Sequence, residues 1–442
     1  MIQDIKKKLK RTFPGPYTVA KDAYHLVLDR FKVVSRTANH LVFDRFLTVR
    51  SRHKLLDYPS LYSLYSPFFT FGVAVDSWKT RFPFPMEIGN PEKEQLILHC
   101  FNSITCENSF KHLYCFDPAA DCLFRISPAA KHVLTFAKKN HIKLRLHVLV
   151  WHRQSNLSVF CRDYQCVYLD DDPKQLDPAC LVSREELIQR LKTYIYGAAE
   201  YIYANGYADC ISGWDVVNEA VSNHRNEFLR TNSLWMQIIG PEYIYYSFLY
   251  MREAGARYAE QYKDLYGGRH INPRLFYNDY NEWFPKKQEK IIRLLRDTVL
   301  NPDHLIQSDA VNPDGNGTLL GDGLVDGIGM QGHLDTDVDV SQFMSAMKAY
   351  NELTGLVHVT ELDVANRSYP DTEKTALLYN ELFQAFVDAV KNGIGLESVT
   401  VWGLMDDRAY KREKHITLLF DEKLNPKKEF YAVVEAVKDD HG

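Results

Sequence analysis

The sequence predicts an α/β protein built on a (β/α)8 TIM barrel with an N-terminal extension. From about residue 68 onward, short runs rich in β-branched and aromatic residues alternate with longer amphipathic segments. The chain has 442 residues and is 45% hydrophobic, which is enough for one large domain with its own core. An open doubly wound sheet is the structural alternative, but it would more often show a glycine-rich phosphate turn after an early strand, and the sequence has none.

Residues 1–57 are expected to form the extension and residues 58–442 the barrel. Within the extension, HLVLDRFKVVSR, starting at His25, recurs as HLVFDRFLTVRS, starting at His40. One such pair is too few for a solenoid, and the segment is too small to support a core of its own. The pattern therefore predicts two short amphipathic elements packed on the barrel.

The strands are expected at Phe69–Val75, Phe101–Cys106, Ile142–Val150, Gly213–Glu219, Arg274–Asn281, Asp326–Leu334, Leu356–Val364 and Ser398–Leu404. Helical patterns lie between them. One helix is expected to begin at a capping box of Ser183 and Glu186, and another to end at Asn392-Gly393. Eight alternations of strand and helix predict a closed barrel, in which the chemistry lies at the carboxyl ends of the strands.

Composition limits the possible partners and locations. The net charge is −4, so nothing favours nucleic acid or an anionic membrane. The basic stretch KKKLKR is followed by prolines and charges, not by the apolar core of a signal peptide. This pattern predicts a cytoplasmic protein if Met1 is the native start. If the N-terminus is truncated, we expect a secreted protein. The eight cysteines include no CxxC pair, so we expect no zinc site. We expect reduced thiols in a cytoplasmic protein, and the even count allows disulfides if the protein is secreted.

Polar and aromatic side chains lie at the ends of most predicted strands. One strand-end carboxylate is more often a helix cap or a surface group, and a lone histidine is usually structural. In a closed barrel, however, all strand ends face one basin. Glu219 and Glu361 lie on the fourth and seventh predicted strands, roughly across that ring. Two carboxylates surrounded by amides, a lysine and aromatic faces are the groups that glycoside hydrolysis requires, and sugar rings stack on aromatic side chains.

Seven segments make a more specific resemblance: FNSITCENSFK, HVLVWHRQ, WDVVNEA, YNDYN, GIGMQGHL, VTELDV and VTVWG. In this order, over roughly residues 58–440, they resemble the endo-1,4-β-xylanases of glycoside hydrolase family 10. The combination of WDVVNE with TELD at this separation is the most specific part of the match.

The resemblance implies a retaining endo-1,4-β-xylanase that acts on xylan or xylo-oligosaccharides without a metal or other cofactor. Glu219 would be the general acid/base and Glu361 the nucleophile. Asn218 would bind the sugar 2-hydroxyl, and His333, backed by Asp363, would hold Glu361 ionised. The other residues implied to contact substrate are Glu107, Asn108, Lys111, His147, Trp151, Gln154, Tyr280, Gln331, Trp402 and Tyr410.

Three positions depart from the family pattern. His112 replaces a tryptophan after the subsite lysine, Leu146 replaces a glycine before His147, and Tyr410 replaces a tryptophan that covers the cleft. These changes concern substrate detail and leave the reaction class unaltered.

Three other functions remain open from the residues alone. His333-x-Asp335 and Glu361-x-Asp363 have the residue types of a metal-dependent barrel enzyme. A carbohydrate-binding homologue without catalysis is the second. A hydrolase of short xylo-oligosaccharides or of other β-1,4-glycans is the third. Oligomeric state is not readable from the sequence.

Overall fold

The computed structural model describes residues 57–77, 87–169, 176–305, 315–367, 369, 372–406 and 415–437. The chain divides into two compact units, Met1–Tyr58 and Pro59–Gly442, and the barrel lies in the second. The predicted extension falls almost wholly outside the described residues and stays a prediction. Within the described residues, no helix is long and apolar enough to cross a membrane.

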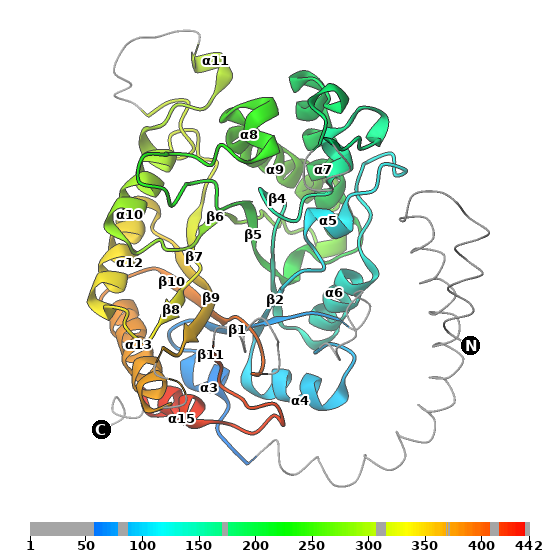
Figure 1. Ribbon diagram of the computed structural model, residues 1–442. Coiled ribbons are helices and arrows are strands. Elements are labelled where there is room, and N and C mark those ends of the chain that lie inside the picture. The colour runs from blue at the N-terminus through cyan, green and yellow to red at the C-terminus, as the bar shows by residue number, and fades with distance from the viewer. Residues whose placement is uncertain are drawn as a thin grey trace, which may run out of the picture. The chain divides into compact units, whose positions relative to one another are not determined.

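Eight parallel strands close into a barrel, as predicted (Figure 1). Each strand pairs with its neighbour in chain order, and the last pairs with the first, Thr70 lying opposite Ser398. The strands are β1 (Thr70–Val75), β2 (Ser103–Cys106), β3 (Lys143–Leu146), β5 (Ile211–Asn218), β6 (Leu275–Asp279), β7 (Gly327–Met330), β9 (Val357–Ala365) and β10 (Leu396–Val401). All eight carboxyl ends therefore meet at one rim of the barrel.

A helix follows each barrel strand and packs outside the ring, where Figure 1 shows the helices surrounding the strands. In chain order they are α4 (Pro91–Cys100), α6 (Pro128–Asn140), α7 (Arg184–Ala204), α9 (Glu242–Gln261), α10 (Pro285–Ile292), α12 (Val340–Thr354), α13 (Glu373–Lys391) and α15 (Lys428–Glu435). The shorter α3 (Leu61–Tyr65), α5 (His112–Cys115), α8 (Leu234–Ile239) and α11 (Pro302–Leu305) complete the α-helices of the described residues.

The two helix boundaries predicted from capping are confirmed. The Ser183 hydroxyl caps α7 by accepting from the Glu186 N–H at 3.2 Å. The Glu186 side chain, however, pairs with Arg190 one turn later, so only the serine half of the capping box forms. Helix α13 ends at Lys391 with Asn392 as its C-cap, and Gly393 follows with φ of +85°, a conformation that glycine adopts without strain.

Two predicted strands are each divided in two, so their predicted continuity was wrong. The segment 142–150 forms β3 and then β4 (Val150–Trp151), which pairs only with β5. The segment 326–334 forms β7 and then β8 (His333–Asp335), which pairs only with β9. Periodicity does not reveal the breaks, because buried parallel strands are apolar on both faces and read as continuous runs.

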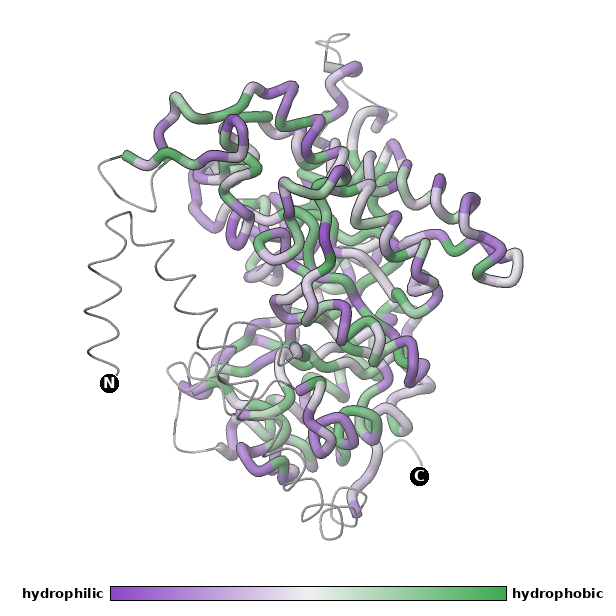
Figure 2. The backbone as a smooth tube through the Cα atoms, turned by 90° about the vertical axis from the view of Figure 1, so that its right-hand side faces the viewer, coloured by the Kyte–Doolittle hydropathy of each residue, from purple (hydrophilic) through white to green (hydrophobic). Residues whose placement is uncertain are grey.

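The strands are buried on both faces, and the hydrophobic segments gather towards the inside of the barrel unit (Figure 2). The barrel interior also holds polar side chains, which need space. A Cβ atom at Gly329 would lie 2.2 Å from Asn278 Oδ1 and 3.0 Å from an Arg145 nitrogen. Glycine at this position on β7 therefore leaves room for the polar groups that support the rim.

Candidate active site

Glu219 follows β5 directly and faces the rim from a strained backbone conformation. Its φ is +55°, in the left-handed region that side chains rarely adopt, at a cost of about 1–3 kcal/mol. The Glu219 N–H donates to the Asn278 carbonyl at 2.9 Å, which fixes the turn at the strand end. The residue is 8% exposed, so the carboxyl group is largely removed from water.

Glu361 lies within β9, and its two oxygens are held from two sides. Asn278 Nδ2 donates to Oε1 at 2.9 Å, and His333 Nε2 donates to Oε2 at 3.2 Å. The His147 ring stands 3.9 Å from Oε1. The carboxyl group is thus oriented by groups from β6, β8 and the segment after β3, all distant in sequence.

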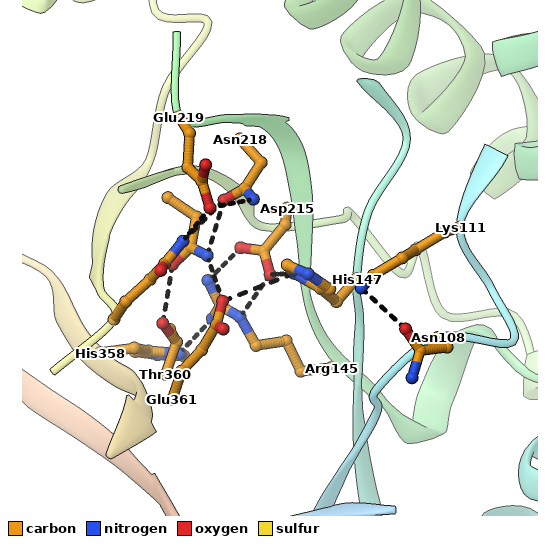
Figure 3. A network of polar contacts seen from close by, with 12 residues as sticks. Asn108, Lys111, Arg145, His147, Asp215, Asn218, Glu219, His358, Thr360 and Glu361 are labelled. Atoms are coloured by element: carbon orange, nitrogen blue, oxygen red, sulfur yellow. Dashed lines mark hydrogen bonds and ion pairs between the residues drawn. The ribbon is translucent and has the colours of Figure 1, made fainter. Parts of the chain in front are cut away.

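A chain of amides connects the two carboxyl groups (Figure 3). Asn218 Oδ1 accepts from Asn278 Nδ2 at 2.9 Å and from Gln331 Nε2 at 3.1 Å. Gln331 Nε2 also donates to Glu219 Oε1 at 3.2 Å. Glu219 and Glu361 therefore belong to one buried hydrogen-bonded network, and neither side chain can reorient without breaking bonds in it.

His333 is the positive group of the site. Its Nδ1 donates to Asp363 at 2.9 Å while its Nε2 donates to Glu361, so both ring nitrogens carry protons. Burial lowers the pKa of His333, but the Asp363 and Glu361 carboxylates outweigh burial and raise it to about 10. At neutral pH the charged His333 ring therefore lies between the carboxylates of Asp363 and Glu361.

The two glutamates have opposite pKa shifts. Burial raises the pKa of Glu219, and the negative charges of Asp279 and Glu361 raise it further. Burial also acts to raise the pKa of Glu361, but His147, His333 and the Asn278 amide outweigh it and hold this pKa below its ordinary value. The environment thus favours a protonated Glu219 beside an ionised Glu361.

His152 adds a neutral neighbour to Glu219. Its Nδ1 lies 4.0 Å from Glu219 Oε2. Burial, followed by the positive charges of Arg230, Arg153 and Lys287, lowers the pKa of His152 to about 3. A neutral imidazole does not stabilise a carboxylate by charge, so His152 does not oppose the raised pKa of Glu219.

A second polar cluster forms around Lys111 and brings together several of the residues that the resemblance implies. Its ammonium donates to Gln154 Oε1 at 2.8 Å and to Asn108 Oδ1 at 3.1 Å, and it stands 4.9 Å from the centre of the Trp151 ring. Burial lowers the pKa of Lys111 to about 8, against the attraction of Glu361 and other carboxylates. The predicted Glu107 directly precedes Asn108 at the end of β2.

The remaining predicted residues also lie around the two glutamates. The Trp402 ring stands 5.5 Å from His147 and 6.3 Å from His333, edge to face. The Tyr280 hydroxyl accepts from Arg230 at 2.8 Å, and the same arginine donates to the Glu219 carbonyl at 2.7 Å. Tyr410 lies outside the described residues and stays a prediction.

Sequence reasoning missed the groups beneath the rim. The Arg145 guanidinium makes a buried ion pair with Asp215, and Asp215 accepts from His147 at 3.0 Å, which positions that ring under Glu361. Thr360 donates to Asn278 Oδ1 at 2.7 Å and orients its amide. A charged residue inside each of two apolar strands was the available signal, since unpaired charges are almost never buried.

Two departures from the family pattern are buried in the packing. His112 is 2% exposed, stacks on Phe116 at 4.9 Å, and accepts from the Asn156 N–H at 3.0 Å. Burial lowers its pKa to about 3, so it is a neutral core side chain. Leu146 is fully buried on β3. Both side chains are therefore part of the packed core.

The residues named for a metal site are engaged in other contacts. Asp335 pairs with Arg367 at 2.5 Å, while His333 donates both of its protons to carboxylates. Within the described part of the chain, no group of three or more His, Cys, Asp or Glu side chains is arranged to hold a metal ion.

Comparison with known proteins shows which family this chain is similar to. The model of the glycosyl hydrolase family 10 matches residues 60–436. Endo-1,4-beta-xylanase B of Butyrivibrio fibrisolvens is 32% identical over 86% of this chain and 54% of its own length. An endo-1,4-beta-xylanase of Geobacillus stearothermophilus is 30% identical over 85% of this chain and 98% of its own.

A solved structure is similar along almost its whole length. The intracellular xylanase of Thermoanaerobacterium saccharolyticum aligns with a TM-score of 0.64 and 28% identity, over 85% of this chain and 98% of its own. The chain spans about half of the Butyrivibrio relative (54%) and 30% of the endo-1,4-beta-xylanase A of Thermotoga maritima, so those relatives carry further regions.

Proposed function

Because the chain belongs to glycosyl hydrolase family 10, we propose that it is a retaining endo-1,4-β-xylanase that cleaves xylan or xylo-oligosaccharides by double displacement. The observation that carries the proposal is the pair of opposite pKa shifts at Glu219 and Glu361 within one amide-linked network. The names of the relatives, which are xylanases, support the substrate. A similar structure was solved with xylotetraose, which supports a xylo-oligosaccharide ligand.

In the first step, Glu361 attacks the anomeric carbon while Glu219 protonates the departing glycosidic oxygen. Attack requires an ionised carboxylate, which His333 and Asn278 hold and orient. Protonation requires a neutral Glu219, which burial and the nearby negative charges favour. The bond to the leaving sugar breaks as the glycosyl–Glu361 ester forms.

In the second step, water replaces Glu361 at the anomeric carbon. Formation of the ester removes the negative charge of Glu361, which is one of the causes that raise the pKa of Glu219. Glu219, having given up its proton, is then favoured in its ionised form and accepts a proton from the attacking water. One residue thus serves as acid and then as base.

The cluster around Lys111 is proposed to bind sugar hydroxyls on the non-reducing side. Asn108, Lys111 and Gln154 present donors and acceptors, and Trp151 offers an indole face for a sugar ring. Trp402 is proposed as the aromatic wall beside the catalytic pair.

The test is proton NMR of the first product released from xylo-oligosaccharides, with wild type beside Glu361→Ala. Retention predicts that the β-anomer appears first and that Glu361→Ala gives no product. An initial α-anomer would mean inversion and would overturn the mechanism. The matched control is Glu253→Ala, which removes a glutamate from a surface ion pair with Lys192 and should retain wild-type turnover.

Glu219 is tested separately through the leaving group. Glu219→Ala should lose about 10²–10⁴-fold in kcat/KM on xylo-oligosaccharides, and far less on an aryl β-xylobioside whose leaving group needs no proton. Equal losses on both substrates would contradict its role as general acid. Cello-oligosaccharides assayed in parallel distinguish a β-glucanase, and binding without turnover would indicate a carbohydrate-binding homologue.

A further inference from the structure

Three cysteines gather in the loop between β4 and α7, outside the candidate active site. Cys161 Sγ lies 3.1 Å from Cys166 Sγ and 3.9 Å from Cys180 Sγ. Cys161 is therefore the central sulfur of the group, in contact with both others. The spacing along the chain gave no sign of this cluster, because the three residues do not form a CxxC motif.

The surrounding loop holds Cys161 and Cys180 in place. On α7, Arg190 donates to the Val159 carbonyl at 2.8 Å and to the Cys161 carbonyl at 2.9 Å. Cys161 also forms an antiparallel backbone bridge with Leu181, the neighbour of Cys180. The contacts between the sulfurs therefore belong to a bonded scaffold.

The three thiols differ in their access to solvent. Cys161 is fully buried and Cys180 is 9% exposed, whereas Cys166 is half-buried between exposed neighbours, of which Val167 is 50% exposed. Burial, and then contact with the Cys166 thiol, raise the pKa of Cys161. A small disulfide in solution therefore meets Cys166 first. Once Cys166 is oxidised, its own contribution to the raised pKa of Cys161 is removed.

We propose that Cys161 and Cys166 form a reversible thiol–disulfide site that is closed by a small disulfide such as oxidised glutathione. The Cys166 thiolate attacks one glutathione sulfur and releases the first reduced glutathione. The Cys161 thiolate then attacks the Cys166 sulfur of the mixed disulfide and releases the second. Two protein thiols are oxidised, one glutathione disulfide is reduced, and the two thiol protons pass to the released glutathione thiolates.

The site is linked to the cleft through a short stretch of chain. The stretch begins at Gln154, which accepts a hydrogen bond from Lys111. The next residue, Ser155, accepts from the Trp235 indole at 3.1 Å. The 3₁₀ helix Leu157–Phe160 follows and leads directly to Cys161. The disulfide would restrict this loop and leave the catalytic glutamates untouched. The proposed thiol–disulfide site does not depend on the proposed xylanase activity.

Trypsin can identify the linked pair without ambiguity. Arg153, Arg162, Lys174 and Arg184 bound three peptides, residues 154–162, 163–174 and 175–184, each with one cysteine of the cluster. The full-length protein is equilibrated in oxidising glutathione buffer, alkylated and digested, and the peptides are identified by mass spectrometry. We expect two of the eight thiols to be lost, peptides 154–162 and 163–174 to be joined, and dithiothreitol to restore both thiols.

Two results would overturn the proposal. One is alkylation of all eight thiols after equilibration in the oxidising buffer, and the other is a link only between peptides 154–162 and 175–184. In the Cys166→Ser variant, all remaining thiols should stay reduced in the oxidising buffer and be alkylated. Cys122→Ser is the matched control, because Cys122 is also half-buried but its thiol donates to the Phe124 carbonyl. This variant should still lose two thiols and form the same link.

Discussion

Replacing His333 with glutamine tests how the site keeps Glu361 ionised. The change removes the imidazolium that donates to Glu361 at 3.2 Å and to Asp363 at 2.9 Å, and leaves a neutral amide of similar size. Without the positive charge the carboxylate form of Glu361 is less stable, so the pKa of Glu361 should rise. Asp363 then also loses its partner, and its negative charge acts in the same direction.

The size of the shift follows from the lost interaction. A hydrogen bond to a charged group contributes roughly 1.5–3 kcal/mol. One pKa unit corresponds to about 1.36 kcal/mol, so the pKa of Glu361 should rise by about one to two units. Asn278 at 2.9 Å and His147 at 3.9 Å remain, and they limit the change.

The assay is kcat/KM against pH on an aryl β-xylobioside with a good leaving group. This substrate needs no proton from Glu219, so the acid limb reports the ionisation of Glu361 in the free enzyme. The acid limb should move to higher pH, because activity is lost where Glu361 becomes protonated. His270→Gln, at an exposed ion pair with Glu260, should leave the limb unchanged. An acid limb of His333→Gln that coincides with wild type would refute the reasoning.

Three further predictions concern the supporting groups. Lys111→Met should raise KM for xylo-oligosaccharides about 10-fold through one lost hydrogen bond. Burial lowers the pKa of Lys111 to about 8. The KM of wild type should therefore rise above pH 8, where Lys111 loses its charge, while the KM of the variant stays constant with pH. Burial raises the pKa of Glu282 to about 8, so wild type loses folding stability as pH rises from the ordinary carboxyl range to pH 8. The free energy of unfolding of Glu282→Gln, measured in guanidinium, should therefore exceed that of wild type by about 2–5 kcal/mol at pH 8 and equal it at pH 4. Asn278→Ala removes the amide that donates to Glu361, so kcat/KM should fall roughly 10–10²-fold while circular dichroism confirms folding.

Much of the fold and the identity of the central residues could be predicted from the sequence. Alternating apolar runs and amphipathic segments record which faces are buried, and burial is a local requirement on each element. The cap at Ser183 and the stop at Gly393 are local for the same reason. Glu219 and Glu361 stood out because a carboxylate in an apolar strand, or directly after one, is costly to bury unless it is paired or used.

The supporting contacts could be read only from the tertiary structure. Asn278 and Glu361 are 83 residues apart, and Arg145 and His358 are 213 apart, so whether they touch depends on how the ring closes and in which register. The sequence also did not show that His112 is buried among aromatic rings or that three scattered cysteines meet.

By itself, then, the sequence determined the alternation of elements, the strand ends and the two glutamates, because each follows from local burial and residue type. The family resemblance already implied which of the two would be ionised, and only the tertiary structure showed the burial and the neighbouring charges that shift their pKa values in opposite directions. The physical reason is that a pKa depends on desolvation and on charges within a few ångströms, and in a closed barrel those charges come from strands far apart in the chain.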